Sequence, residues 1–152
     1  MSESPVYILP TRALLDTQTI RSALDVLIEE HSAGLPVTDG SGKLLGFLST
    51  YRIIGLLLPR AMTDSHLGLR DLSFIANSLG HVQEKMEEIG GERVGDYMES
   101  IDHVVHPDTP VTEVMLLLYR AENRLPVADR ETGHLLGLVS ATRLLEAIAG
   151  KS

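Results

Sequence analysis

The chain has 152 residues, of which 43% are apolar and 22% are charged, and this balance is typical of a soluble globular protein. Its net charge is −8 and its 13 lysines and arginines are scattered singly, so it lacks the basic stripe that binds nucleic acid. Because the longest apolar stretch, residues 53–58, is too short to span a bilayer, and because the chain has neither a cysteine nor a secretory signal, we expect a cytoplasmic protein that contacts no membrane.

The first third of the chain predicts the order strand, helix, strand, strand, helix. Thr19 is a candidate N-cap, and the residues that follow it at helical spacing are Ile20, Ala23, Leu24, Leu27 and Ile28. Gly34 is the expected stop of this helix. The other elements are a first strand around residues 13–15, strands over residues 35–38 and 44–48 with a turn at residues 39–42, and a second helix from about Thr50 to Leu58.

A connection at residues 60–95 follows, which is longer than a structureless loop in a compact protein. Apolar residues recur in it every three or four positions, at Leu72, Ile75, Ala76, Leu79, Val82, Met86 and Ile89. This spacing predicts a helix over about Asp71 to Ile89, closed by Gly90 and Gly91. The apolar stripe requires a covering surface, which is either the core of the same protein or a second subunit.

The last third of the chain repeats the first. Leu-Pro-Val-Thr-Asp at residues 35–39 returns as Leu-Pro-Val-Ala-Asp at residues 125–129, and Leu-Leu-Gly at residues 44–46 returns at residues 135–137. The offset changes from 90 to 91 because the second copy has one more residue in the turn. Self-similarity of this kind indicates two related units. The second copy predicts a first strand at residues 103–105, then Thr109 as cap, Pro110 in the first helical position, and the apolar stripe Val111, Val114, Met115 and Leu118.

The repeated order is an amphipathic helix, Leu-Pro-Val-x-Asp, a turn, Leu-Leu-Gly with two apolar residues and serine, and a short helix. This order resembles the CBS domain, named for cystathionine β-synthase, and Asp96-Tyr97-Met98 before the second copy is similar to the usual start of such a domain. The whole chain resembles a tandem CBS pair, or Bateman module. The resemblance implies an α+β fold of two βαββα repeats packed with pseudo-twofold symmetry, with repeat one at residues 1–59, a helical linker at 60–95 and repeat two at 96–152.

A tandem CBS pair implies a regulatory module rather than an enzyme. Such modules commonly bind adenine nucleotides or adenosyl compounds in two clefts, usually form homodimers, and regulate another protein. We therefore expect no required cofactor, a small-molecule ligand such as AMP, ADP, ATP or an S-adenosylmethionine-like compound, a homodimer, and an effector protein that the sequence does not identify. The alternative is a ligand-free interaction or dimerisation scaffold whose nucleotide clefts are degenerate.

The resemblance also assigns candidate ligand-binding residues in each copy. Backbone contacts to the adenine would come from Ser32, Ala33, Gly34, Leu35, Glu122, Asn123, Arg124 and Leu125. First-strand positions that would line the clefts are Ile8, Ala13, Met98 and His103. The phosphate and ribose side would use Ser49, Tyr51, Arg52, Ser140, Thr142 and Arg143. Ser49 and Ser140 also stand where they can cap the helices that follow, either as caps alone or beside an anion that the helix N-terminus favours.

Arg52 and Arg143 depart from the CBS pattern. In nucleotide-binding members an aspartate at this position accepts hydrogen bonds from both ribose hydroxyls, whereas a guanidinium has no acceptor. Two interpretations of the arginines remain open. Either each arginine binds ligand phosphate together with the helix N-terminus, or each forms a salt bridge with carboxylates of the partner repeat.

No group in the sequence is a candidate for catalysis or for metal binding. The six histidines are scattered, and the spacing typical of zinc sites is missing. The chain also lacks a cysteine nucleophile, a Gly-x-Ser-x-Gly elbow and a phosphate-binding glycine loop. We therefore expect neither an enzyme nor a metalloprotein.

Overall fold

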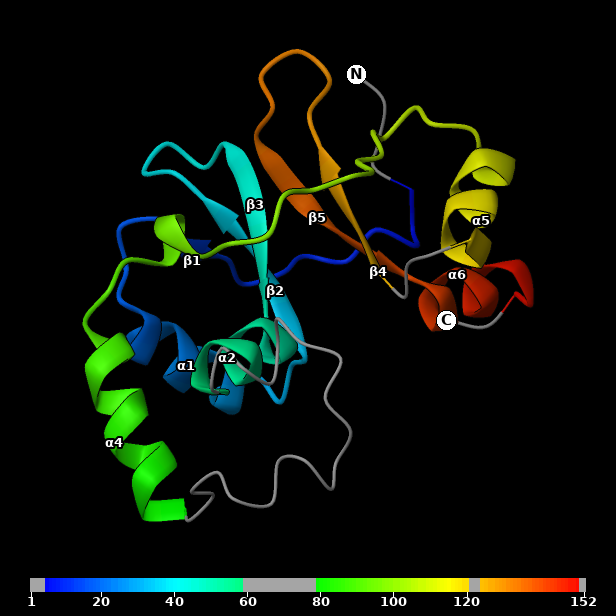
Figure 1. The fold of residues 1–152 in the computed structure, drawn as a ribbon. Helices are drawn as coiled ribbons and strands as arrows, with labels where there is room; N and C mark the ends of the chain where they lie inside the picture. Colours follow the sequence, from blue (N-terminus) through cyan, green and yellow to red (C-terminus); the bar gives the residue numbers. More distant parts are fainter. Residues whose placement is uncertain (1–4, 59–78, 121–123, 151–152) are drawn as a thin grey trace. The chain divides into compact units, whose positions relative to one another are not determined.

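The computed structural model describes residues 5–58, 79–120 and 124–150, with Arg124 described by its backbone only (Figure 1). The chain forms two compact units, and each unit takes segments from both sequence copies. The first unit comprises Met1–Ala13, Pro36–Gly46 and Ser100–Ser152, and the second unit comprises Leu14–Leu35 and Phe47–Glu99. Within the described ranges, no helix has both the length and the apolar character needed to cross a membrane.

Helix α1 of the second unit, Ile20–Glu29, begins where the sequence predicts. The Thr19 hydroxyl caps it by accepting a hydrogen bond from the Ser22 N–H at 3.2 Å. The buried residues of the helix are Ile20, Ala23, Val26 and Leu27. Ile28, expected on the same face, is 62% exposed, so the buried face is turned toward Val26.

The predicted helix stop at Gly34 is wrong. Helix α1 ends at Glu29, and His31, with φ of 50°, takes the left-handed conformation that glycine usually provides after a helix. Gly34 is instead the first residue of strand β2, Gly34–Thr38. A Cβ atom at Gly34 would lie 2.5 Å from Cε1 of Phe47, so the glycine permits the close approach of the phenylalanine ring.

The other strands are β1 Leu14–Leu15, β3 Leu44–Ser49, β4 Arg124–Ala128 and β5 Leu135–Ser140. They form a three-stranded sheet in the order β1-β2-β3 and a two-stranded antiparallel sheet of β4 and β5. The strand expected at residues 103–105 is reduced to a parallel bridge between Val105 and Val127. The predicted strands of both hairpins are therefore confirmed, with the first strand of copy two shortened.

Helix α4, Leu79–Gly90, is the described part of the helix predicted between the copies, and the expected start at Asp71 lies outside the described residues. Figure 1 shows α4 beside α1 and beside helix α2, Thr50–Leu57. Met86 and Ile89 of α4 are buried. Met86 and Ile89 therefore cover the same unit, as in the first of the two predicted alternatives, whereas Leu79 of the predicted stripe is 74% exposed.

The remaining helices are the short 3-10 helix η2 Val94–Asp96, α5 Val111–Arg120 and α6 Ala141–Ile148. The core of the first unit is a cluster of buried apolar residues, namely Val105, Val114, Leu125, Val127, Val139 and Leu144. Helix α5 begins at Val111, one residue later than predicted from Pro110. Val114 of its predicted stripe is buried, whereas Val111 and Met115 are 41% and 43% exposed.

Two hairpin turns pair with each other in the first unit. The Leu44 N–H donates to the Gly133 carbonyl and the Leu135 N–H donates to the Gly42 carbonyl, each at 3.0 Å. Gly42 and Gly133 have φ of 95° and 78°, which glycine adopts at little cost.

An aspartate closes each of these turns. Asp39 Oδ1 accepts from the Ser41 hydroxyl at 2.7 Å and from the Lys43 N–H at 3.0 Å, and Asp129 Oδ1 accepts from the Thr132 N–H at 2.9 Å. Hydrogen bonds from Ser41 and Lys43 lower the pKa of Asp39, and those from the backbone of Thr132 and Glu131 lower the pKa of Asp129.

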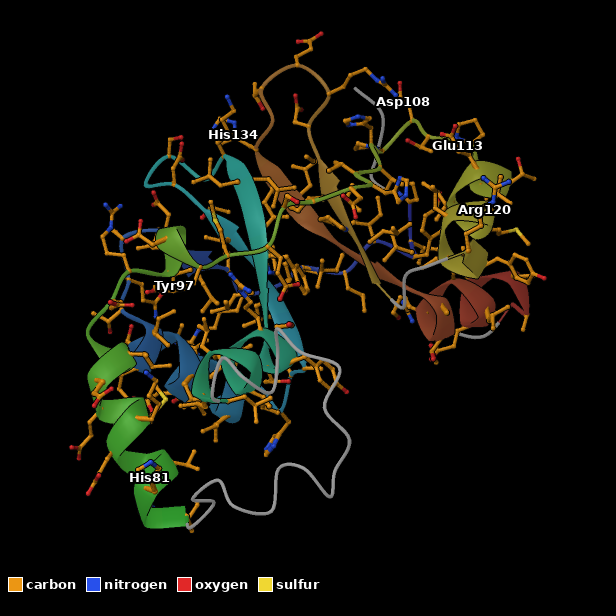
Figure 2. All side chains as sticks on the ribbon, viewed as in Figure 1. His81, Tyr97, Asp108, Glu113, Arg120 and His134 are labelled. Carbon is orange, nitrogen blue, oxygen red and sulfur yellow. The ribbon has the colours of Figure 1, made fainter. Side chains whose placement is uncertain are left out.

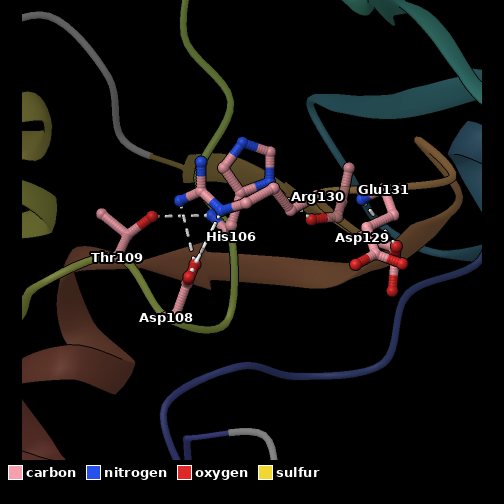
Figure 3. Close-up of polar contacts among 7 residues, drawn as sticks. His106, Asp108, Thr109, Asp129, Arg130 and Glu131 are labelled. Carbon is pink, nitrogen blue, oxygen red and sulfur yellow. Dashed lines mark hydrogen bonds and ion pairs between the residues drawn. The ribbon is translucent and has the colours of Figure 1, made fainter.

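Polar contacts also fix the loop before α5 (Figure 3). Arg130 Nη2 donates to Asp108 Oδ1 at 2.9 Å, and this hydrogen bond lowers the pKa of Asp108. The Thr109 hydroxyl accepts from the His106 N–H at 2.9 Å, so it binds the turn that precedes α5. His106 Nδ1 in turn lies 2.8 Å from the Ala128 carbonyl oxygen, which ties the loop to β4.

Candidate functional site

Helix α2 begins at a serine that makes two hydrogen bonds. Ser49 Oγ accepts from the Arg52 N–H at 3.0 Å, which caps the helix as predicted. The same hydroxyl donates to Oε1 of Glu99 at 2.6 Å, a length typical of a charge-assisted bond. Since a hydroxyl has one proton, Ser49 directs its only donor to a carboxylate.

Glu99 is held by its backbone as well as by its side chain. Its N–H donates to the Phe47 carbonyl at 2.7 Å, and the Phe47 N–H donates to the Glu99 carbonyl at 3.0 Å. This antiparallel bridge holds Glu99 beside β3, where its carboxylate reaches Ser49. Glu99 was not among the predicted site residues, and its place directly after Asp96-Tyr97-Met98 is the only sequence signal that points to it.

Arg52 contacts the segment that leads into copy two. Its Nε donates to the carbonyl oxygen of Tyr97 at 2.8 Å. Among the described residues, Arg52 forms no ion pair. The Tyr97 hydroxyl donates to the Glu92 carboxylate, and this hydrogen bond raises the pKa of Tyr97 because ionisation would break it beside a negative charge. Figure 2 shows Tyr97 directly after η2.

The first unit has a similar arrangement at the start of α6. Ser140 Oγ accepts from the Arg143 N–H at 3.1 Å, so Ser140 caps α6 as predicted. Arg143 Nη1 lies 3.2 Å from Glu146 Oε2, and Nη2 donates to the Val6 carbonyl at 3.5 Å. Nε of Arg143 is buried and has no hydrogen-bond partner among the described residues.

Of the two interpretations of the arginines, the salt bridge is seen at Arg143, but not, as that interpretation held, with the partner repeat. Glu146 belongs to the same helix and stands three residues further on, not in the partner repeat. The reason is local geometry, because residues three apart on a helix share a face. Both arginines also donate to a backbone carbonyl of a segment that leads into a sequence copy, Arg52 to Tyr97 and Arg143 to Val6.

Other predicted residues of the second unit lie around the same helix start. Ser32 Oγ donates to the Gly34 carbonyl at 2.6 Å. The Ala33 carbonyl accepts from the Thr50 N–H at 2.8 Å, so the segment before β2 contacts the first turn of α2. Of the remaining predicted residues, Leu35 is buried, Met98 is half-buried and Tyr51 is 74% exposed.

In the first unit, fewer of the predicted site residues have described contacts near the start of α6. Arg124 stands opposite Ser140 in the β4–β5 pair, and Ile8 packs against the core cluster of this unit. Of the remaining predicted residues, Leu125 is buried, Ala13 is half-buried, and His103 and Thr142 are exposed. Glu122 and Asn123 lie outside the described residues.

The chemistry that these two helix starts offer is anion binding. Each combines backbone N–H groups, a serine hydroxyl and a guanidinium, which all donate hydrogen bonds, although at α2 the single hydroxyl proton of Ser49 is already directed to Glu99. Within the ranges that the structure describes, no group of three or more histidine, aspartate or glutamate side chains is arranged to hold a metal ion.

Comparison with known proteins agrees with the repeat. The sequence model of the CBS domain matches residues 1–59 and 94–150. CBSX2, a chloroplastic CBS domain-containing protein of Arabidopsis thaliana, is 29% identical over 132 residues, which are 85% of this chain and 55% of CBSX2. The gamma-3 subunit of 5'-AMP-activated protein kinase from Sus scrofa is 27% identical over 135 residues, which are 89% of this chain and 23% of that subunit.

The chain thus spans about half the length of CBSX2 and about a quarter of the kinase subunit. The crystal structure of CBSX2 in complex with AMP has the same fold, with a TM-score of 0.67 at 24% identity over 95% of this chain and 93% of that chain. The predicted α+β class is therefore confirmed. Because the family model matches both sequence copies and most of the chain, the protein belongs to the CBS domain family as a tandem CBS pair.

Proposed function

We propose that the chain is a regulatory module that binds an adenine nucleotide and changes the activity of a partner protein. The observation that supports this most is the repeated helix start, in which a capping serine is followed three residues later by an arginine. Such a set of donors favours a phosphate group. The complex of CBSX2 with AMP, and the likeness to a subunit of an AMP-activated kinase, support an adenine nucleotide as the ligand.

In this proposal the phosphate, rather than the ribose, provides the main polar contact at Arg52 and Arg143. A guanidinium only donates hydrogen bonds, so it stabilises phosphate oxygens but cannot accept from the ribose hydroxyls. We therefore expect AMP to bind more tightly than adenosine. Binding regulates a partner to the extent that the nucleotide prefers one of two conformations of the module.

A thermal-shift panel of adenosine, AMP, ADP, ATP, NAD, S-adenosylmethionine and cyclic dinucleotides tests the proposal. A ligand at one hundred times its Kd stabilises the folded state by about 2.7 kcal/mol. For a chain of this length the midpoint should rise by roughly 5–10 °C with an adenine nucleotide and less with adenosine. Arg143→Ala should reduce the shift. No shift with any compound would contradict ligand binding.

We also propose that the module forms a homodimer through α5 and α6 of the first unit. Both helices expose large apolar side chains, and large exposed apolar surfaces of soluble proteins often mark interaction sites. These side chains belong to Val111, Met115, Leu116, Tyr119, Leu145 and Ile148. A second copy with the same surface supplies a matching apolar partner.

A ligand-free interaction scaffold is the second candidate function. The Arg143–Glu146 pair and the Ser49–Glu99 hydrogen bond favour it, because both polar groups already have internal partners. The ion pair is partly exposed to water, and surface pairs contribute only roughly 0–1 kcal/mol, so a phosphate can compete with it. The thermal-shift panel separates the two functions, since a scaffold without a ligand gives no shift.

A further inference from the structure

Among the described residues, a carboxylate accepts the hydroxyl hydrogen bond of the capping serine at one of the two corresponding helices but not at the other. At α2, Glu99 accepts the Ser49 hydroxyl at 2.6 Å. In the first unit the corresponding position is Leu9, whose bridge with Leu138 is the counterpart of the bridge between Glu99 and β3. Among the residues that the structure describes, no carboxylate accepts the Ser140 hydroxyl.

We infer that Glu99 is an internal occupant of the anion position at the α2 N-terminus, so that a nucleotide binds first in the first unit, at Ser140 and Arg143. The inference rests on the proposed function. It adds which of the two helix starts binds the nucleotide and which residue hinders binding at the other. The replacement of Glu99 by Leu9 at the bridge makes the surroundings of the two capping serines unequal.

Three features favour Glu99 over an incoming phosphate. Its backbone forms both hydrogen bonds of the bridge to Phe47, at 2.7 and 3.0 Å, so the residue is fixed before any ligand arrives. Its carboxylate takes the only proton of the Ser49 hydroxyl. Its negative charge at a helix N-terminus is favoured by the helix dipole, and it repels a second anion at the same place.

Glu146 does not close the first unit in the same way. It pairs with the guanidinium of Arg143 at 3.2 Å, and the two side chains are 24% and 42% exposed. Nε of Arg143 is buried, one N–H of Nη1 is used by Glu146 and one of Nη2 by the Val6 carbonyl. A guanidinium has five N–H donors, so one N–H on each Nη remains for a phosphate while these contacts are kept. No described carboxylate accepts a hydrogen bond from the Ser140 hydroxyl, so this hydroxyl remains available to a ligand at the start of α6.

The test is isothermal titration calorimetry with AMP on the full chain, using an exchange of the two residues. Wild type should bind one equivalent, and Glu99→Leu should bind two. Leu9→Glu should weaken the single binding event at least tenfold. The double exchange should again bind one equivalent, now lost on adding Arg52→Ala. Glu87→Leu, at an exposed position of α4, is the matched control for loss of a carboxylate and should leave one equivalent.

Two equivalents in wild type, or one equivalent in both wild type and Glu99→Leu, would overturn the inference. If Glu99→Leu unfolds, Glu99→Gln removes the charge and keeps an acceptor for Ser49, and it should still gain the second equivalent. Binding by Glu99→Leu alone would uphold the closure by Glu99 and overturn the assignment of first binding to Ser140 and Arg143. Absence of AMP binding in wild type and in both Glu99 variants would overturn the proposed function itself.

Discussion

Two glycines stand where any side chain would collide with a neighbour. A Cβ atom at Gly34 would lie 2.5 Å from the Phe47 ring, and one at Gly137 would meet the carbonyl oxygen of Leu9. We expect Gly34→Ala and Gly137→Ala each to destabilise the fold by about 1–3 kcal/mol, as overpacking does. Urea unfolding measures the change.

Gly55 provides the control for these glycine substitutions. It lies inside α2, and a Cβ atom there would meet nothing within 4 Å. Gly55→Ala should therefore raise the free energy of unfolding by roughly 0.5–1 kcal/mol through helix propensity. If all three substitutions changed the free energy of unfolding in the same direction, the close approaches at Gly34 and Gly137 would not be the reason for glycine there.

The role of a single residue can be predicted from the sequence when its contacts are with residues close to it in the chain. Ser49 and Ser140 cap helices that begin at the next residue, so a short motif is enough to identify them. Glu99 escaped prediction because its hydrogen bond joins it to Ser49, fifty residues away, through a bridge that no local pattern encodes. The partner of Arg143 was missed for the opposite reason, since it lies on the same helix turn.

The two serine caps differ in what else they bind, and this difference can be measured. Ser140→Ala should cost about 0.5–2 kcal/mol, the usual value for a lost N-cap. Ser49→Ala should cost more, because it also removes the hydrogen-bond donor of Glu99. Adding Glu99→Leu should remove the extra cost of Ser49→Ala. Equal costs for the two serine variants would contradict an energetic role of the Glu99 contact.

The two aspartate turns give the stability a dependence on acid. Hydrogen bonds hold the pKa values of Asp39 and Asp129 below the ordinary value of 3.8 in the folded chain. A group with a lowered folded pKa stabilises the fold above its ordinary pKa, and this stabilisation is lost as the pH falls toward the folded pKa. The free energy of unfolding should therefore decrease as the pH is lowered below about 4.

Variants of the two aspartates check this dependence. Asp39→Asn combined with Asp129→Asn should flatten the acid side of the stability profile measured by urea unfolding between pH 2 and 6. Asp102→Asn removes an exposed carboxylate that makes no hydrogen bond among the described residues, and it should leave the slope closer to wild type. A slope unchanged in the double variant would show that other groups govern the acid response.

Element type was easier to predict than element ends. Periodicity located α1, β2, β3 and the described part of α4 because each has one buried face. The stop of α1 was misplaced because His31 supplies the left-handed residue for which the sequence suggested Gly34. Burial of Val26 instead of Ile28 depends on the helix that covers α1, which periodicity alone does not specify.

For the molecule as a whole, the sequence repeat predicted two related units, but not how segments are shared between them. Copy-one residues 1–13 and 36–46 belong to the same compact unit as most of copy two. Bridges such as Leu9–Leu138 and Phe47–Glu99 join residues far apart in the chain, and such pairings leave no local pattern in one sequence. The family resemblance supplied the arrangement that periodicity could not.

The assembly of the whole molecule is open to a direct test at α5 and α6. Tyr119 and Leu145 are 88% and 61% exposed, so they contribute little to the core of their own chain. If this surface joins two copies, Tyr119→Glu with Leu145→Glu should shift sedimentation from dimer to monomer across a dilution series, with an unchanged circular dichroism spectrum. Gln83→Glu, which adds one negative charge to the exposed side of α4, should leave the dimer intact. A monomer in wild type, or a dimer that survives the paired substitution, would remove α5 and α6 as the interface, because two buried carboxylates facing their symmetry copies cannot be accommodated in an apolar contact.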